Sequence, residues 1–441
     1  MAPTLAQLLA RQSIEYSHAL AQEIARDRDI QHKYVTAQVK QLLYTPLSAL
    51  QNTPTPVLFI IDALDECGGE TSDSEEESHQ AVSEMLEALI TALPSSVMLP
   101  VKFLVTSRPE THIRDTPVSN ANFSQILRLH TVNKEEVDAD IHQYITATLN
   151  IKLSSKPNIR LRFTEKMVEN LVRICDGLFI VASTALKHTF GAGSDAAEAR
   201  FKTLLNESHD GLSARVATPL DRMYKFILES ATGKDEQDIT ELSALLRLLA
   251  SLLSARMMLS IAALADHLAQ EPCVVHASLS RLHAVVHVPE NDDVPGVRTV
   301  HASFGDYLLS RAPDHIRISR LLGHKTLAYG CLNVMGRHLR FNISSSASSY
   351  DPNSSTRPDS ISLSLEYACL HWAHHVAAYR LSDDSNSNIS TFDTMIVQKF
   401  RPKCLFWLEV LSVLNKVGNA SGLLLIARST VSQLSQTLYG N

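Results

Sequence analysis

The feature that most constrains the fold is a short apolar run, Val57–Ile61, that ends directly in the acidic residue Asp62. A continuous run of β-favouring residues between a proline and an acid is typical of a strand buried on both faces of a parallel sheet. Residues 101–106 form a second run of this kind, and residues 126–129 form a weaker third one. The sequence therefore predicts three strands in this part of the chain.

The segments between and around these runs predict helices. Residues 81–93 have helical spacing, whereas residues 68–80 are polar enough to predict an exposed loop. The resulting strand, helix, strand, helix order favours a parallel α/β sheet over roughly residues 50–145. Residues 4–50 predict two helices, with Pro46 ending the pattern.

The remainder of the chain is expected to be mainly helical. After Val132 the helical pattern continues to about Leu268, and residues 282–289 and 297–301 then predict two small strands. Ser-rich, low-complexity loops are expected at residues 344–362 and 382–390, within a helical C-terminal region. The Trp372 and Trp407 segments are expected to be aromatic anchors of the core.

Composition excludes several classes of protein. The chain has 441 residues, enough for about three domains, and 40 Lys and Arg against 47 Asp and Glu give a net charge of −7. That balance provides no basic field for nucleic acid. Six widely spaced cysteines without a C-x-x-C pair predict neither a disulfide framework nor a zinc ribbon. Because the sequence also shows no membrane span and no secretory signal, we expect a cytoplasmic protein.

The acids after the first strand suggest nucleotide chemistry. Asp62 lies at the carboxyl end of a predicted parallel strand, where ligands bind in such sheets. An acid there can hold Mg²⁺, and the following acids, Asp65 and Glu66, can orient water beside a γ-phosphate, as in a Walker B motif. Arg108 follows the second strand on the same rim, where its planar cation could contact a terminal phosphate. The alternatives are a solvated acidic loop and a surface arginine.

These segments resemble the Walker B and sensor 1 motifs of fungal NACHT-domain proteins, which are STAND-class P-loop NTPases related to NOD-like receptors. The two segments are residues 59–67 (FIIDALDEC) and 102–110 (KFLVTSRPE). Further segments resemble the helical, winged-helix and C-terminal parts of this family in the family's order: residues 176–180 (DGLFI), 220–224 (LDRMY), 301–308 (HASFGDYL), 365–369 (LEYAC) and 406–412 (FWLEVLS).

The resemblance implies a role for each candidate residue. Asp62 would belong to the Mg²⁺ site, Asp65 and Glu66 would position water, and Arg108 would sense the γ-phosphate. His301 would contact the β-phosphate of bound ADP and lock the inactive state. The implied cofactors are ATP and ADP, or GTP, with Mg²⁺.

The resemblance also implies a domain order. Helices over residues 1–50 would precede a partial NACHT core over 51–145, which is an incomplete α/β P-loop NTPase sheet. A helical domain (146–215), a winged-helix domain (216–312) and a C-terminal helical arm (313–441) would follow. The implied function is a nucleotide-controlled switch in fungal innate immunity or self/non-self signalling, acting through protein partners or self-association.

The sequence lacks the phosphate-binding loop, G-x-x-x-x-G-K-[ST], that such an NTPase requires. Either the chain begins just after that loop, or the domain is degenerate and serves as a helical scaffold for partner proteins. In both cases we expect weak nucleotide binding and no catalytic competence. A third alternative is a metalloenzyme, because His371, His374 and His375 share one helical face.

Overall fold

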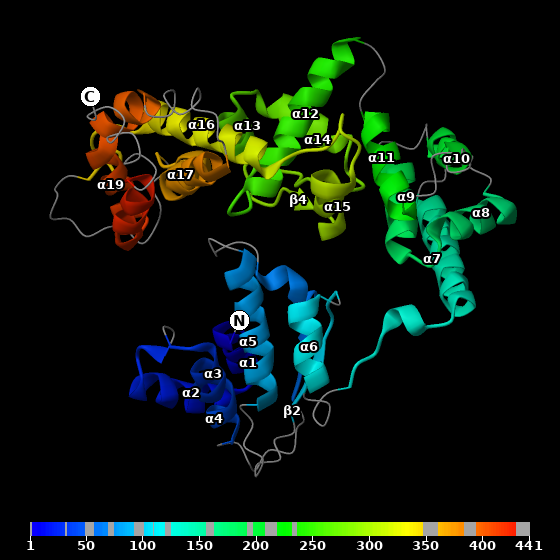
Figure 1. Cartoon of the computed structure of the whole chain (residues 1–441), viewed down its shortest axis with the longest axis horizontal. Helices are drawn as coiled ribbons and strands as arrows, with labels where there is room; N and C mark the ends of the chain where they lie inside the picture. The colour runs from blue at the N-terminus through cyan, green and yellow to red at the C-terminus, as the bar shows by residue number, and fades with distance from the viewer. Residues whose placement is uncertain are drawn as a thin grey trace. The chain divides into compact units, whose positions relative to one another are not determined.

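The chain folds into two compact units, Met1–Thr131 and Val132–Asn441, which are described separately (Figure 1). A computed structural model describes residues 2–30, 33–48, 57–68, 75–91, 101–108, 110–119, 125–155, 163–191, 197–207, 218–231, 236–346, 360–382 and 394–428. Both units are predominantly helical, and the first contains a small parallel sheet. This confirms the expected fold class of a small parallel sheet followed by mainly helical structure.

The first unit has helices on either side of each strand along the chain. Its elements are α1 (Ala2–Gln12), α2 (Ile14–Arg26), α3 (Val35–Gln38), η2 (Val39–Tyr44), α4 (Thr45–Ser48), β1 (Val57–Ile61), η3 (Leu64–Gly68), α5 (Glu75–Thr91), β2 (Val101–Val105), α6 (Thr111–Ser119) and η4 (Leu129–Thr131).

The helical stretch formed by α3, η2 and α4 continues through Pro46, so the prediction of two helices that end at this proline is wrong. A proline in a helix offers no N–H to the carbonyl four residues earlier. Here that carbonyl belongs to Leu42, and it accepts a 2.5 Å hydrogen bond from the buried Tyr16 hydroxyl. The Thr45 N–H donates to the carbonyl of Lys40 in a π-helical turn. The polar groups displaced by Pro46 are therefore satisfied.

Strands β1 and β2 pair in parallel, from Val57 opposite Val101 to Ile61 opposite Val105. One face of this sheet is buried against the helical core, where Phe59 stacks on Phe103 with 5.1 Å between ring centroids. The opposite face carries Leu58, Ile60 and Leu104, which are 56%, 64% and 52% exposed. The expectation that the first strand is buried on both faces is therefore wrong, because the described helices pack on only one face.

Two other predictions for the first unit are also wrong. Residues 125–128 form no regular element, and Leu129–Thr131 form a 3₁₀ turn instead of a third strand. Ile126, Leu127 and Leu129 are largely exposed, which shows that apolar content alone does not make a strand without a partner strand. Helix α5 begins at Glu75, so residues 75–80 are helical and not loop. His79 and Gln80 are exposed on this helix, so their polarity belongs to a solvated helical face and does not indicate a loop.

The second unit consists almost entirely of helices in its described parts. Its elements are α7 (Lys134–Ser155), α8 (Glu165–Cys175), α9 (Phe179–Gly191), α10 (Ala197–Glu207), α11 (Pro219–Ala231), α12 (Glu236–Ser254), α13 (Ile261–Leu268), α14 (Pro272–Ser280), β3 (Val286–His287), β4 (Arg298–Thr299), α15 (Ala302–Asp306), η5 (Tyr307–Arg311), α16 (Arg320–His338), α17 (Leu363–Ser382), η6 (Ile396–Phe400), η7 (Arg401–Lys403), α19 (Cys404–Val413) and η8 (Val417–Asn419).

The expected pair of small strands is present as an antiparallel pair, β3 and β4, although each has only two residues. The predicted core anchors Trp372 and Trp407 are confirmed, since both are fully buried. Trp407 donates a 2.9 Å hydrogen bond from its indole N–H to the carbonyl of Cys369. Most of the two predicted Ser-rich loops lies outside the described residues.

Helix α16 lies very close to its neighbours at two glycines. A Cβ at Gly330 would lie 2.4 Å from the carbonyl oxygen of His267, and a Cβ at Gly323 would lie 2.1 Å from that of Ala250. Any side chain at these positions would push the backbones apart. None of the helices in the described residues combines the length and apolar character that a membrane crossing needs.

Candidate functional site

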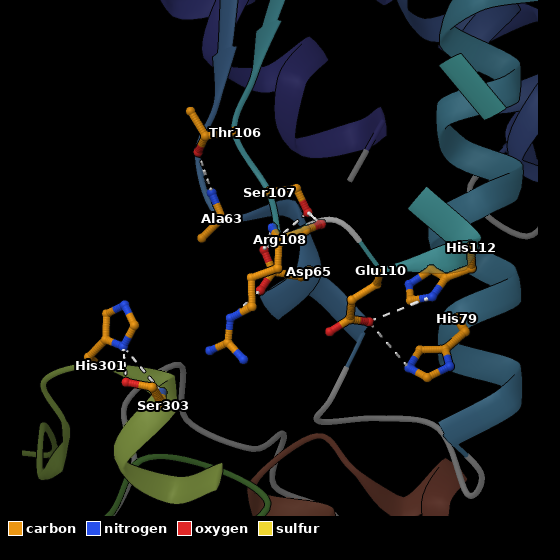
Figure 2. Close-up of polar contacts among 10 residues, drawn as sticks. All are labelled: Ala63, Asp65, His79, Thr106, Ser107, Arg108, Glu110, His112, His301 and Ser303. Atoms are coloured by element: carbon orange, nitrogen blue, oxygen red, sulfur yellow. Dashed lines mark hydrogen bonds and ion pairs between the residues drawn. The ribbon is translucent and has the colours of Figure 1, made fainter. Parts of the chain in front are cut away.

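The carboxyl ends of β1 and β2 lie together, because the two strands are in register. Asp62 follows β1 and Thr106 follows β2, and the Thr106 hydroxyl donates a hydrogen bond to the Asp62 carboxylate. The Thr106 hydroxyl oxygen also accepts a 3.0 Å hydrogen bond from the N–H of Ala63 (Figure 2). The Thr106 carbonyl accepts a 3.0 Å hydrogen bond from the N–H of Leu64. Thr106 thus fixes both the acid and the turn that follows it.

The turn after Asp62 is conformationally strained. Ala63 has a φ of 51°, in the left-handed region that residues with a Cβ rarely adopt. Such a conformation costs on the order of 1 kcal/mol and persists only where the surroundings hold it. The hydrogen bonds to Thr106 provide that restraint. The chain therefore turns abruptly into η3, which carries the next two acids, Asp65 and Glu66.

Asp65 and Arg108 form an ion pair, with 3.2 Å between the Arg108 Nε and a carboxylate oxygen of Asp65. The other carboxylate oxygen accepts 3.1 Å hydrogen bonds from the Arg108 backbone N–H and from the Ser107 hydroxyl. The Asp65 side chain is only 7% exposed, whereas that of Arg108 is 38% exposed. Asp65 is therefore engaged by the end of β2, whereas Glu66 is exposed on η3.

His301 belongs to the second unit and caps the start of α15. Its Nδ1 accepts a 3.2 Å hydrogen bond from the Ser303 N–H and lies 2.6 Å from the Ser303 hydroxyl (Figure 2). The Ser303 hydroxyl is in turn 2.8 Å from that of Tyr224. Because Nδ1 is an acceptor here, the neutral ring carries its proton on Nε2, and this exposed N–H is a donor.

Three histidines that suggested a metalloenzyme do not form a ligand group. His375 is completely buried, and its ring nitrogens lie 2.7 Å from the Tyr367 hydroxyl and 2.9 Å from His324 Nδ1. Burial and nearby positive charge lower the pKa of His371 to about 4. Across the described part of the chain, the three do not converge as metal ligands. Burial instead keeps His371 and His375 uncharged, because it lowers the pKa of both rings.

Sequence reasoning missed the hydroxyl residues that hold the two acids and one group of metal-binding side chains. Thr106 and Ser107 were visible as polar residues at the end of the second strand, which is the signal that could have identified them. Another group, His79, Glu110 and His112, places its ligand atoms within 4.8 Å of one another. His79 lies in the segment predicted to be a loop, which hid its helical position beside the other two.

A comparison with known families gives one partial match. The family model described as Nephrocystin 3, N-terminal, matches residues 1–108. This region contains β1, β2 and the first-unit candidate residues from Asp62 to Arg108. The match supports a general relation to NTPase-type proteins and nothing more specific. The match covers less than half of the 441 residues. No curated protein and no solved structure matches the chain.

Proposed function

We propose that this chain is part of a NACHT-type STAND signalling NTPase, in which ATP or ADP, or GTP, with Mg²⁺ controls a conformational switch. The observation that supports this best is the parallel pairing of β1 and β2, because it brings Asp62, Asp65 and Arg108 to one edge of the sheet. This edge is the usual position of ligands in parallel sheets.

The contacts refine the roles that the resemblance implies. Asp62 would hold Mg²⁺, with its carboxylate oriented by Thr106. Glu66 would orient water, because it is exposed, whereas Asp65 is occupied by Arg108 and Ser107. Arg108 would have to exchange Asp65 for a terminal phosphate, so the ion pair would hold the arginine while no nucleotide is bound. The proposed role of His301 toward an ADP phosphate comes from the resemblance.

The 441 residues contain no phosphate-binding loop, whose backbone N–H groups and lysine make most contacts to the phosphates in this class. On its own the chain should therefore bind nucleotide weakly. In the proposed setting, a fungal cytoplasmic signalling pathway of the innate-immunity or self/non-self type, it would act through protein partners or self-association on activation.

Titration of the chain with fluorescent ATP and ADP analogues in the presence of Mg²⁺ tests whether the chain on its own binds nucleotide weakly. We expect no saturation in the submicromolar range. Submicromolar binding would mean that the phosphate contacts come from residues other than a G-x-x-x-x-G-K-[ST] loop.

The second candidate function is a degenerate, non-catalytic scaffold that binds partner proteins. The exposed apolar face of the sheet, with Leu58, Ile60 and Leu104, favours this alternative. The two functions differ in what Asp62→Ala does: a scaffold should keep its partner binding, whereas a nucleotide-controlled switch should lose its nucleotide dependence.

A further inference from the structure

The first unit contains a second group of polar side chains, at the start of α6 and outside the strand-end site. His79 comes from α5, Glu110 directly precedes α6, and His112 lies in the first turn of α6 (Figure 2). His112 Nδ1 lies 3.6 Å and His79 Nε2 lies 4.0 Å from the same carboxylate oxygen of Glu110. Two imidazoles and one carboxylate therefore face a common point.

The packing of two helices holds the backbone of these residues close together. One turn further along α5 and α6, the hydroxyls of Ser83 and Thr116 lie 3.3 Å apart. Because Ser83 follows His79 by four residues and Thr116 follows His112 by four, the same faces of both helices are in contact at both levels. The Glu110 carbonyl accepts hydrogen bonds of 3.0 and 2.8 Å from Ile113 and Arg114, which holds Glu110 at the helix start.

The spacing of the polar atoms suits a metal ion better than direct hydrogen bonds. Separations of 3.6 and 4.0 Å are too long for hydrogen bonds between a ring nitrogen and a carboxylate. Two ligands bound at about 2.1 Å in tetrahedral geometry lie roughly 3.4 Å apart. A small inward movement of these side chains would therefore bring all three to ligand distance.

The side chains have room to make that movement. His79, Glu110 and His112 are 50%, 39% and 18% exposed, so none is locked in a packed core. The two imidazole rings are stacked, with 4.1 Å between centroids and 17° between planes. Binding a shared ion requires the rings to open by rotation about their Cβ–Cγ bonds, which their exposure permits.

We propose that His79, Glu110 and His112 form a binding site for Zn²⁺ or a similar divalent transition-metal ion. Two neutral imidazoles and one carboxylate are a ligand set that such ions use, with the remaining position left for water. The bound ion would join the beginning of α6 to α5. Glu110 is two residues after Arg108, so the ion would also restrain the segment that leads from the strand end. The site does not depend on nucleotide binding.

Zinc titration of the metal-free chain against a chromogenic chelator tests this proposal. We expect the wild-type chain to bind one more equivalent of Zn²⁺ than the His79→Ala/His112→Ala double variant. Glu110→Gln, which keeps the shape but removes the charge, should weaken this binding by roughly tenfold or more. Co²⁺ provides a spectroscopic check, because the wild-type chain should show visible bands that the double variant lacks.

A matched control uses another exposed histidine and glutamate pair. His142 Nε2 lies 2.7 Å from a carboxylate oxygen of Glu165, so this pair offers two ligand atoms in place of three. His142→Ala should leave zinc binding at the wild-type level. Equal stoichiometry and affinity for the wild type and the double variant would overturn the proposal. If circular dichroism shows that the double variant is unfolded, His79→Ala alone decides in the same way, because His79 is half exposed.

Discussion

The two units differ in where they place their polar and apolar groups. In the first unit, Asp62, Asp65 and Arg108 lie at the edge of a two-stranded sheet. The face of this sheet that points away from the helical core exposes leucine and isoleucine. In the second unit, a continuous helical core buries tryptophans and even an uncharged histidine, His375. The comparison teaches that the candidate residues at the strand ends lie on the less completely buried unit. In the second unit, where His301 is the one candidate residue, the described helices serve mainly for packing.

Acidification should give the largest difference, because it should lower the stability of the second unit through its buried histidines. Burial and nearby positive charge lower the pKa of His324 and His371 to about 4, from an ordinary 6.5, and hold that of His375 well below its usual range. As the pH falls below 6.5, the unfolded chain takes up protons that the folded unit does not. The second unit should therefore be fully stable above pH 6.5 and should lose on the order of 3 kcal/mol per group such as His371 as the pH approaches 4.

Tryptophan fluorescence measures this loss selectively, because the chain has two tryptophans and both lie in the second unit. Urea unfolding followed by this signal at several pH values should show the decline between pH 6.5 and 4. A free energy of unfolding that is constant over this range would contradict the assignment of these histidines as neutral core residues.

Substitution of Gly330 by alanine should give the next largest effect. The new Cβ would lie 2.4 Å from the backbone oxygen of His267, so α16 and α13 would have to separate. We expect a loss of about 3 kcal/mol in the free energy of unfolding of the second unit. Gly336→Ala on the same helix is the matched control, because its Cβ would meet only the flexible Lys399 side chain at 3.3 Å. Equal stability of the two variants would mean that α16 and α13 do not approach each other this closely at Gly330.

In the first unit, Arg108→Ala should destabilise the strand ends by about 1–2 kcal/mol. The Asp65 carboxylate, which is only 7% exposed, would lose its ion-pair partner. Hydrogen exchange of residues 57–66 and 101–108 should become faster. Arg114→Ala removes an exposed pair with Asp115 and should change exchange little. Unchanged exchange in Arg108→Ala would show that the pair does not hold the strand ends.

The smallest effect is expected on the exposed face of the sheet. Leu58→Thr and Ile60→Thr replace side chains that are more than half exposed by another β-favouring residue. We expect each to change the free energy of unfolding of the first unit by less than about 0.5 kcal/mol. A loss of several times this size would mean that this face is buried, and the contrast between the two units would become smaller.

The sequence allowed the two paired strands to be predicted, because apolar runs that end in Asp62 and Thr106 have few alternative structures. It also identified Trp372 and Trp407 as core residues. It could not show that Tyr16 satisfies the Leu42 carbonyl and so allows a helix to continue through Pro46, because that contact joins residues distant in the chain. The prediction of a third strand at residues 126–129 was wrong for a related reason, because a strand forms only beside a partner strand and an apolar run alone is not enough.

The candidate site was predictable in part. The strand order is enough to predict that Asp62 and Arg108 lie at one edge, because parallel strands share the edge where their carboxyl ends meet. The Asp65–Arg108 ion pair and the His79, Glu110 and His112 group depend on turn geometry and on helix packing, which periodicity does not encode. The strained Ala63, which directs Asp65 toward β2, is a residue that no local pattern distinguishes.

The rate of nucleotide hydrolysis tests the proposed roles of Asp62 and Arg108 most directly. It is measured in a longer chain to which a phosphate-binding loop has been added. Asp62→Ala should reduce hydrolysis by roughly a hundredfold, because the Mg²⁺ contact is lost, and Arg108→Ala should reduce it as well. Arg114→Ala serves as the control and should leave the rate unchanged. Hydrolysis that is unaffected by both Asp62→Ala and Arg108→Ala would contradict the assignment of the strand ends as a nucleotide site.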